Sequence, residues 1–135
     1  MKYTVLALFF VLSLCSVRSN AQQAAPIVTA GGVKYEQING HWNPAITTCA
    51  VLLSDPRLEA KDGWKVWSYT IGFRPVGKDY VGPFFVKGAS FTSEVKEALK
   101  DQMGGKGEID IESIKVSSPD QGSRTASSIK LKYNN

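Results

Sequence analysis

Residues 91–133 read FTSEVKEALKDQMGGKGEIDIESIKVSSPDQGSRTASSIKLKY, and this stretch decides the fold. Its first part predicts a short helix over about residues 92–102, because Thr92 or Ser93 can cap the start and Gly104-Gly105 can end it. The following part alternates apolar and polar residues, first on odd and then on even positions: Ile109, Ile111, Ile114 and Val116. We expect a β-bulge near residues 112–113, since one extra residue would bring all four onto one face. After the turn residues 118–122, the alternation resumes in a last strand that ends near Tyr133.

Upstream of this stretch, short strand candidates are separated by turn residues. The pair Asn39-Gly40 predicts a two-residue hairpin turn, because both positions favour positive φ. Residues 46–53 are continuously apolar or β-branched and favour a buried strand, in which Cys49 is a small hydrophobic side chain. In residues 64–73 we expect one buried face, made of Trp67, Tyr69, Ile71 and Phe73. Six or seven short strands with one helix predict a mainly β protein, a β-sandwich or a related antiparallel fold.

The N-terminus has the pattern of a secretory signal peptide, residues 1–21. Lys2 precedes an apolar run, and Ser19-Asn20-Ala21 gives small residues before a cut after Ala21. We expect residues 22–26 to be a flexible lead-in and residues 27–135 to be a single domain in the periplasm or outside the cell, with no membrane insertion after cleavage. Loss of the signal would leave 14 basic and 12 acidic residues, a net charge of +2 that gives no argument for nucleic acid. Cys49 would be the remaining cysteine, so no internal disulfide is expected.

The sequence offers little for catalysis. His41 is the one histidine in the chain, and no metal-ligand, phosphate-loop or cofactor spacing surrounds it. A pair of Cys49 and His41 is formally available, but the apolar setting of the cysteine favours a structural role. Asp110 and Glu112 share a strand face, where we expect Lys106, Lys115 and Lys130 to keep them ionised on the solvated side. We therefore expect no enzyme, no cofactor and no metal; hydrolase chemistry would require Asp110, Glu112 or His41 to line a pocket.

Three aromatic residues are candidates for binding a partner. Trp42 follows the predicted hairpin turn, Trp64 starts a strand after Asp62-Gly63, and Tyr80 lies in the glycine-rich segment 75–83. Tryptophan near the end of a loop can anchor a partner, but it can equally cover the core. Both interpretations stay open at this point.

A resemblance to a known family rests on several of these segments. They are residues 88–92 (GASFT), the helix, residues 109–116 (IDIESIKV), residues 119–122 (PDQG) with Arg124, and the last alternating strand. Together with residues 64–71 (WKVWSYTI) they resemble the C-terminal periplasmic domain of GldM/PorM, the gliding-motility and type IX secretion protein of Bacteroidota. Residues 50–52 (AVL) resemble the strand that precedes that domain's long core strand.

The resemblance implies an immunoglobulin-like sandwich with one short helix, whose activity is protein binding. In the family this domain contacts a ring-forming partner of the secretion machine and passes on motion from an inner-membrane motor. The family protein also has a transmembrane helix, a helical bundle and tandem domains, which we do not expect here. No family binding residue can be transferred to a position in this sequence.

Two functions follow as hypotheses. The first is an exported, non-enzymatic protein-interaction module of the cell envelope that binds another envelope protein through strand edges or loop aromatics. The alternative is a secreted small-ligand-binding or inhibitor module, in which the 75–83 loop presents Lys78 and Tyr80. The identity of the partner and the oligomeric state are left open by the sequence.

Overall fold

The structure is a computed structural model that describes residues 26–135. The expected signal peptide and residues 22–25 of the expected lead-in lie outside the described residues. The described part is mainly β, with antiparallel sheets and two helices, which confirms the predicted class. In chain order the elements are β1 (Val28–Ala30), β2 (Tyr35–Ile38), β3 (His41–Pro44), α1 (Cys49–Ser54), β4 (Leu58–Ala60), β5 (Lys65–Pro75), β6 (Val81–Lys87), α2 (Ser93–Asp101), β7 (Lys106–Ser118), β8 (Gly122–Thr125) and β9 (Ile129–Asn134).

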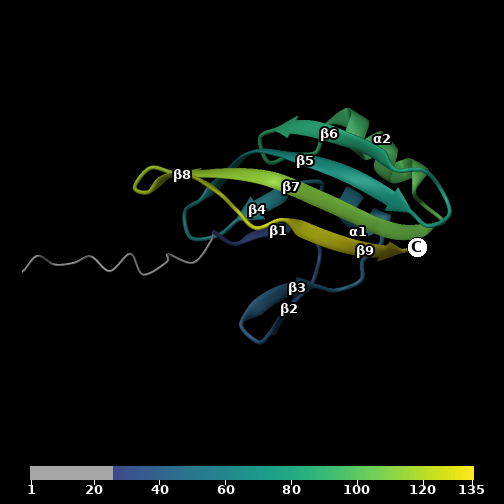
Figure 1. The fold of residues 1–135 in the computed structure, drawn as a ribbon, viewed down its shortest axis with the longest axis horizontal. Helices are drawn as coiled ribbons and strands as arrows, with labels where there is room; N and C mark the ends of the chain where they lie inside the picture. The colour runs from purple at the N-terminus through teal and green to yellow at the C-terminus, as the bar shows by residue number, and fades with distance from the viewer. Residues whose placement is uncertain (1–25) are drawn as a thin grey trace, which may run out of the picture.

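A five-stranded sheet forms the body of the molecule (Figure 1). Its strand order is β6-β5-β7-β8, and β9 also pairs with β7. Strands β8 and β9 share one side of β7, because β8 pairs with residues 115–118 and β9 with residues 106–111. The two longest strands, β5 and β7, therefore lie in the middle of the sheet, and β6 lies at one edge.

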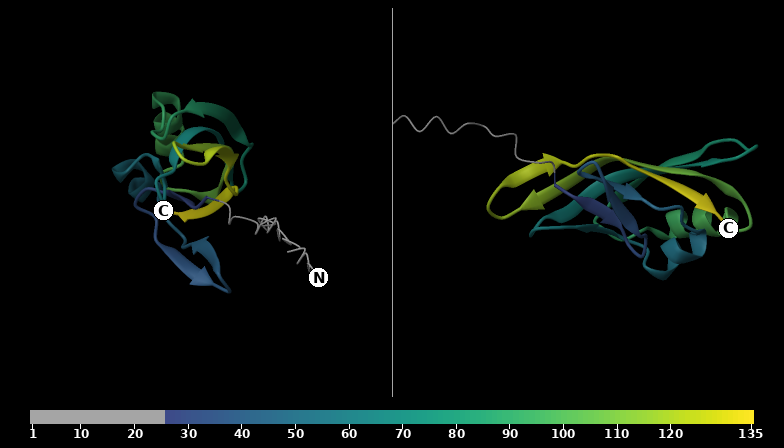
Figure 2. Two further views of the ribbon diagram at one scale, coloured as in Figure 1. Left: turned by 90° about the vertical axis from the view of Figure 1, so that its left-hand side faces the viewer. Right: turned by 90° about the horizontal axis from the view of Figure 1, so that it is seen from below.

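The core lies between one face of this sheet and a layer made of α1, α2 and the β1–β4 pair. Figure 2 shows both helices on the same side of the sheet. The buried residues of this layer include Cys49 and Leu52 from α1 and Val95 and Leu99 from α2, and they belong to one hydrophobic cluster with the sheet residues. We call the sheet face toward the helices the inner face and the opposite one the outer face.

The phase shift expected in β7 is present as a bulge. Ile109, Ile111, Ile114 and Val116 are all buried, as predicted. Ser113 has a φ of 51°, and the register against β5 shifts between the pairs Ser68↔Lys115 and Thr70↔Glu112. The extra residue on β7 lies in this interval, so the prediction near residues 112–113 is confirmed.

A second bulge, on β5, was not expected. The register shifts between the pairs Val66↔Val116 and Ser68↔Lys115, where β5 has the extra residue, Trp67. The two bulges compensate each other, and the pairing beyond both regains its original offset. As a result Val66 is buried and Trp67 is exposed, so the prediction that Trp67 belongs to the buried face is wrong.

The strand predicted for residues 46–53 is also wrong, because most of this segment forms the short helix α1. Thr48 caps the helix by accepting a hydrogen bond from the Val51 N–H at 3.2 Å. The preceding residue, Thr47, makes an isolated parallel bridge with Tyr133 of β9. A short apolar run fits a helix as well as a strand, and here the cap decides. Cys49 is nevertheless fully buried, as predicted, and the part of the resemblance that gave residues 50–52 to a strand does not hold.

The other local predictions agree with the structure. Helix α2 fills most of the predicted range 92–102 and is capped by Thr92, whose hydroxyl accepts from the Val95 N–H at 3.3 Å. Strands β2 and β3 form the predicted hairpin, with positive φ at both Asn39 and Gly40. This hairpin forms a two-stranded sheet of its own and extends away from the body (Figure 1).

Asn135 joins three distant parts of the chain. Its side-chain oxygen accepts from the Cys49 N–H at 2.8 Å, at the start of α1. Its side-chain nitrogen donates to the carbonyls of Gln102 and Gly105, each at 2.9 Å, just after α2. The end of β9 is thus tied to both helices that cover the inner face.

Candidate functional site

Trp42 lies where the sequence predicts it, on the projecting hairpin, and 47% of its surface is exposed. It faces the same side of the hairpin as its cross-strand neighbour Gln37. Both line a groove of about 700 Å³ between the hairpin, the start of β1 and the start of β9. Trp42 is therefore accessible to a partner.

Trp64 lies in a different environment. Its side chain is 8% exposed and belongs to the hydrophobic core. The Arg124 guanidinium from β8 stacks over the ring at 5.6 Å from its centre. Of the two alternatives left open by the sequence, the structure places Trp64 in the core, where it offers little surface to a partner.

Tyr80 is held against the outer face of the sheet, although 44% of it is exposed. Its hydroxyl lies directly over Gly72, so any Cβ at that position would collide with it. Arg74 stacks on the ring at 5.3 Å from its centre. The residue therefore packs on β5, and Lys78 and Asp79 are the exposed charged residues of the segment that precedes it.

Two further exposed aromatic residues, which sequence reasoning missed, lie on the outer face. Trp67 is 68% exposed and Phe85 is 62% exposed. Phe85 pairs with Thr70, and the backbone of Trp67 accepts a hydrogen bond from Gly88 at 2.6 Å. Successive pairs along β5 and β6 thus bring both rings to the same end of the outer face. The sequence does indicate that Phe85 faces outward, because Phe84 and Val86 on either side of it have the opposite parity. It gives no such indication for Trp67, because the bulge breaks the alternation there.

Lysines surround these two aromatic residues. Ser68 pairs with Lys87 of β6 on one side and with Lys115 of β7 on the other. Since neighbouring strands lie about 5 Å apart, the backbones of Lys87 and Lys115 are about 10 Å apart, on either side of Ser68, the residue after Trp67. Lys65 lies two residues before Trp67 on the same strand and is also exposed. We call Trp67, Phe85, Lys65, Lys87 and Lys115 the aromatic-basic patch.

The edge of β6 beside this patch carries backbone groups without a strand partner. In an antiparallel pair, alternate residues point toward the neighbouring strand. Because the Gly88 N–H bonds to Trp67, the backbone groups of Phe84 and Val86 also face β5, while those of Phe85 and Lys87 face away. Within residues 26–135, β6 has no strand on that side and the Phe85 and Lys87 amides make no backbone hydrogen bond.

The titratable residues considered for catalysis lie apart. His41 is exposed on the hairpin and lines the groove beside Trp42, but the lining of that groove includes neither Asp110 nor Glu112, which belong to β7 in the other sheet. The prediction of a solvated position holds for Glu112 but is wrong for Asp110, which is 8% exposed. The Asp110 carboxylate accepts a hydrogen bond from Arg74 at 2.5 Å and lies 3.9 Å from the Lys130 ammonium, one of the lysines predicted beside it. The hydrogen bond with Asp110 raises the pKa of Arg74. Burial raises the pKa of the Cys49 thiol, which favours its protonated form. Among the described residues no group of three or more His, Cys, Asp and Glu side chains could hold a metal ion.

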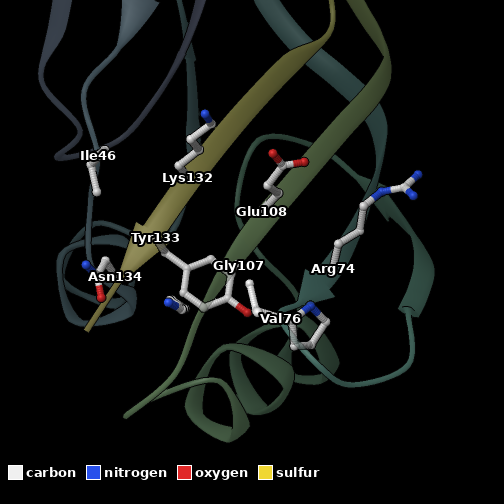
Figure 3. Close-up of a pocket in the computed structure, with 10 residues that line it drawn as sticks. Ile46, Arg74, Val76, Gly107, Glu108, Lys132, Tyr133 and Asn134 are labelled. Atoms are coloured by element: carbon white, nitrogen blue, oxygen red, sulfur yellow. The ribbon is translucent and has the colours of Figure 1, made fainter.

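A hollow of about 500 Å³ lies at the opposite end of the sheet (Figure 3). Glu108 and Lys132 stand on its strands β7 and β9, and the Tyr133 ring lies between these strands near Gly107. The Tyr133 hydroxyl is used inside the fold, where it donates to Gln102 at 3.2 Å. Glu108 lies 3.8 Å from Lys130. Of the charged side chains of this hollow, Arg74 and Glu108 are engaged in ion pairs, whereas Lys106 and Lys132 take part in none among residues 26–135.

No protein-family model matches the chain, and no curated protein matches it. The two helices of the described part are too short to cross a membrane. The assignment of a function therefore rests on the surface chemistry described above.

Proposed function

We propose that this chain is an exported, non-enzymatic protein-interaction module of the bacterial cell envelope. The observation that carries this proposal is the exposure of Trp67 and Phe85 at one end of the outer face, beside the open edge of β6. Exposed aromatic residues in a patch are typical of surfaces that bind other proteins. Trp42 offers a second exposed tryptophan on the hairpin, and Tyr80 widens the outer face.

The fold is proposed to be an immunoglobulin-like sandwich related to the C-terminal periplasmic domain of GldM/PorM. The mainly antiparallel sheet, the capped helix α2 and the bulge at Ser113 support this proposal. Under it, the partner is an envelope protein, and residues 1–21 act as a cleaved signal peptide. A role in type IX secretion or gliding is the function that the resemblance favours.

The alternative, a small-ligand-binding or inhibitor module that uses the 75–83 loop, takes second place. Tyr80 lies on Gly72 and under Arg74, so it is held to the sheet and is not presented by the loop. Without Tyr80, the exposed charged residues of that loop are Lys78 and Asp79, whose opposite charges give it little to recognise a target with.

Site-specific photo-crosslinking in the native envelope tests the proposal. A benzophenone amino acid at position 67, 85 or 42 should give a crosslinked species of defined mass, and the same group at Met103 serves as the matched control. Met103 is exposed too but lies just after α2, away from both tryptophans. Trp67→Ala should weaken the isolated complex by about 2 kcal/mol, as expected for an interface hot spot. Absence of any adduct from positions 42, 67 and 85 would contradict the proposal.

A further inference from the structure

The aromatic-basic patch has a charge that is not neutralised within the described fold. No ion pair among residues 26–135 involves Lys65, Lys87 or Lys115. The acidic residue nearest in the strand pairing is Glu112, opposite Thr70 in the next row. Three lysines against one glutamate leave this end of the outer face basic.

The patch also borders backbone groups that can only be satisfied by water or by another chain. Phe85 and Lys87 each present one N–H and one C=O at the free edge of β6. The side chains of the same two residues point to the outer face, because Phe84 and Val86 face the core. A strand added to this edge would therefore place alternate side chains next to Phe85 and Lys87.

The available edge is short. Pro83 has no N–H, and beyond Lys87 the chain turns away to bond with the start of β4, where the Leu58 N–H donates to the Ala89 carbonyl at 2.9 Å. A proline and a short free length protect an edge from indiscriminate pairing. Recognition here must then depend on side chains as well as on backbone hydrogen bonds.

We propose that the partner docks an acidic, extended segment as an additional strand on β6, with a carboxylate next to Lys87 and an apolar side chain against Phe85 and the Trp67 ring. Lys65 on β5 and Lys115 on β7 lie farther from this strand and add to the basic charge that attracts it. This inference rests on the proposed function and adds the chemistry of the partner. Strand addition supplies affinity through the backbone, and the alternate side chains supply specificity.

Two other occupants fit the patch less well. A second copy of this chain, paired edge to edge through β6, would bring its own three lysines toward these, and like charges in opposition are unfavourable. An anionic lipid surface could neutralise the lysines, but it would leave the amides of Phe85 and Lys87 without partners. The free backbone edge therefore favours a polypeptide.

A peptide selection measures the chemistry of the occupant directly. Random 12-residue peptides displayed on phage are selected against the chain from residue 22 onward, and the best binders are synthesised. We expect them to alternate acidic with apolar residues and to protect the backbone amides of Phe85 and Lys87 from hydrogen exchange in NMR spectra. N-methylation of alternate peptide residues should abolish binding, because it removes the backbone donors that a strand needs.

Reversing the charge of the three lysines of the aromatic-basic patch is the second part of the test. The triple variant Lys65→Glu, Lys87→Glu and Lys115→Glu should bind the selected acidic peptides at least about tenfold more weakly, because it makes this end of the outer face acidic. A matched triple variant, Lys34→Glu, Lys106→Glu and Lys132→Glu, changes the net charge equally at positions away from the patch, and it should bind as the wild type does. Circular dichroism checks that both variants are folded.

Several results would overturn the inference. The proposal of an acidic segment would be wrong if the selected peptides were neutral or basic. It would also be wrong if both triple variants lost binding equally. Self-association through β6 in analytical ultracentrifugation, or binding to phosphatidylglycerol vesicles without protection of the Phe85 and Lys87 amides, would assign the patch to one of the other occupants. If position 67 still crosslinks to a protein in these cases, the proposed function stands and only the acidic strand is wrong.

Discussion

Tyr69 and Tyr133 are the largest of the fully buried side chains among residues 26–135, and the Tyr69 hydroxyl has one visible partner. It donates to the Ala89 carbonyl at 3.2 Å, and the ring packs edge-on against Phe91 with centres 6.4 Å apart. Burial raises the pKa of Tyr69 well above its ordinary value, since the phenolate would lose its hydration there. The same cause raises the pKa of Tyr35 and of Tyr133.

These tyrosines predict alkaline unfolding. The unfolded chain loses the phenolic protons near pH 10, whereas the folded chain keeps them to higher pH. Their contribution to stability is therefore complete below about pH 10 and is lost as the pH rises through the raised pKa values of the folded state. Urea unfolding between pH 7 and pH 11.5 should show a steep loss of stability above about pH 10.

Tyr69→Phe should make this loss less steep, and Tyr80→Phe is the matched control on the surface. At pH 7 the Tyr69 variant should lose about 1 kcal/mol with its hydrogen bond. An unchanged slope above pH 10 in Tyr69→Phe would mean that another group controls alkaline unfolding.

At the scale of the element, the two compensating bulges in β5 and β7 decide which aromatic side chain meets solvent. Without the extra residue on β5, strict alternation would direct Trp67 to the core side together with Tyr69. The bulge on β7 restores the original pairing offset between β5 and β7. The outward-facing residues of the two strands therefore stay aligned beyond it. The exposed tryptophan of the patch thus depends on a backbone feature at Ser113 of the adjacent strand.

Ser113 provides a test of this pairing. With a φ of 51° it occupies the left-handed region, where a side chain costs about 1 kcal/mol relative to glycine. Ser113→Gly should raise the free energy of unfolding in urea by up to about 1 kcal/mol. Ser117→Gly, in the regular part of β7, should lower it by about 0.5 to 1 kcal/mol. A loss of stability in Ser113→Gly would show that the serine side chain itself holds the bulge.

The sequence predicts one bulge and not the other for a physical reason. In β7 the apolar residues change parity, so the shift is visible in the sequence itself. In β5 both Val66 and Trp67 are apolar, and alternation alone cannot tell which one faces the core. The helix α1 was missed for a similar reason, because its apolar run is too short to show a period and only the Thr48 cap distinguishes it.

The residues of the candidate site also divide into those that the sequence could predict and those that it could not. Trp42 was predicted from an unambiguous turn, and it is exposed. The core position of Trp64, the packing of Tyr80 on Gly72 and the lysines that flank Ser68 all depend on strand pairings. Sequence periodicity gives the faces of single strands, but it does not give the partners across a sheet.

At the scale of the whole molecule, Asn135 connects the last strand to both helices. Its side chain makes three hydrogen bonds to backbone groups at 2.8 to 2.9 Å. Asn135→Ala should therefore lower the free energy of unfolding by about 2 kcal/mol, since each such bond contributes about 0.5 to 1.5 kcal/mol.

Asn134→Ala is the matched control, because its side chain is exposed and the change should cost less than about 0.5 kcal/mol. Asn135→Asp should fall between the two, since a carboxylate keeps the bond from Cys49 but cannot donate to the two carbonyls. Equal thermal unfolding of the wild type and Asn135→Ala would show that the helices are held by core packing alone.

The position of β7 has a consequence for the order in which the chain can fold. This strand needs β5 from upstream and β9 from downstream, so the sheet cannot close before residues 129–134 are free to pair. Pairings between such distant segments form late and slowly. Local elements such as the β2–β3 hairpin need no distant partner and can form first, whereas the five-stranded sheet waits for its last strand.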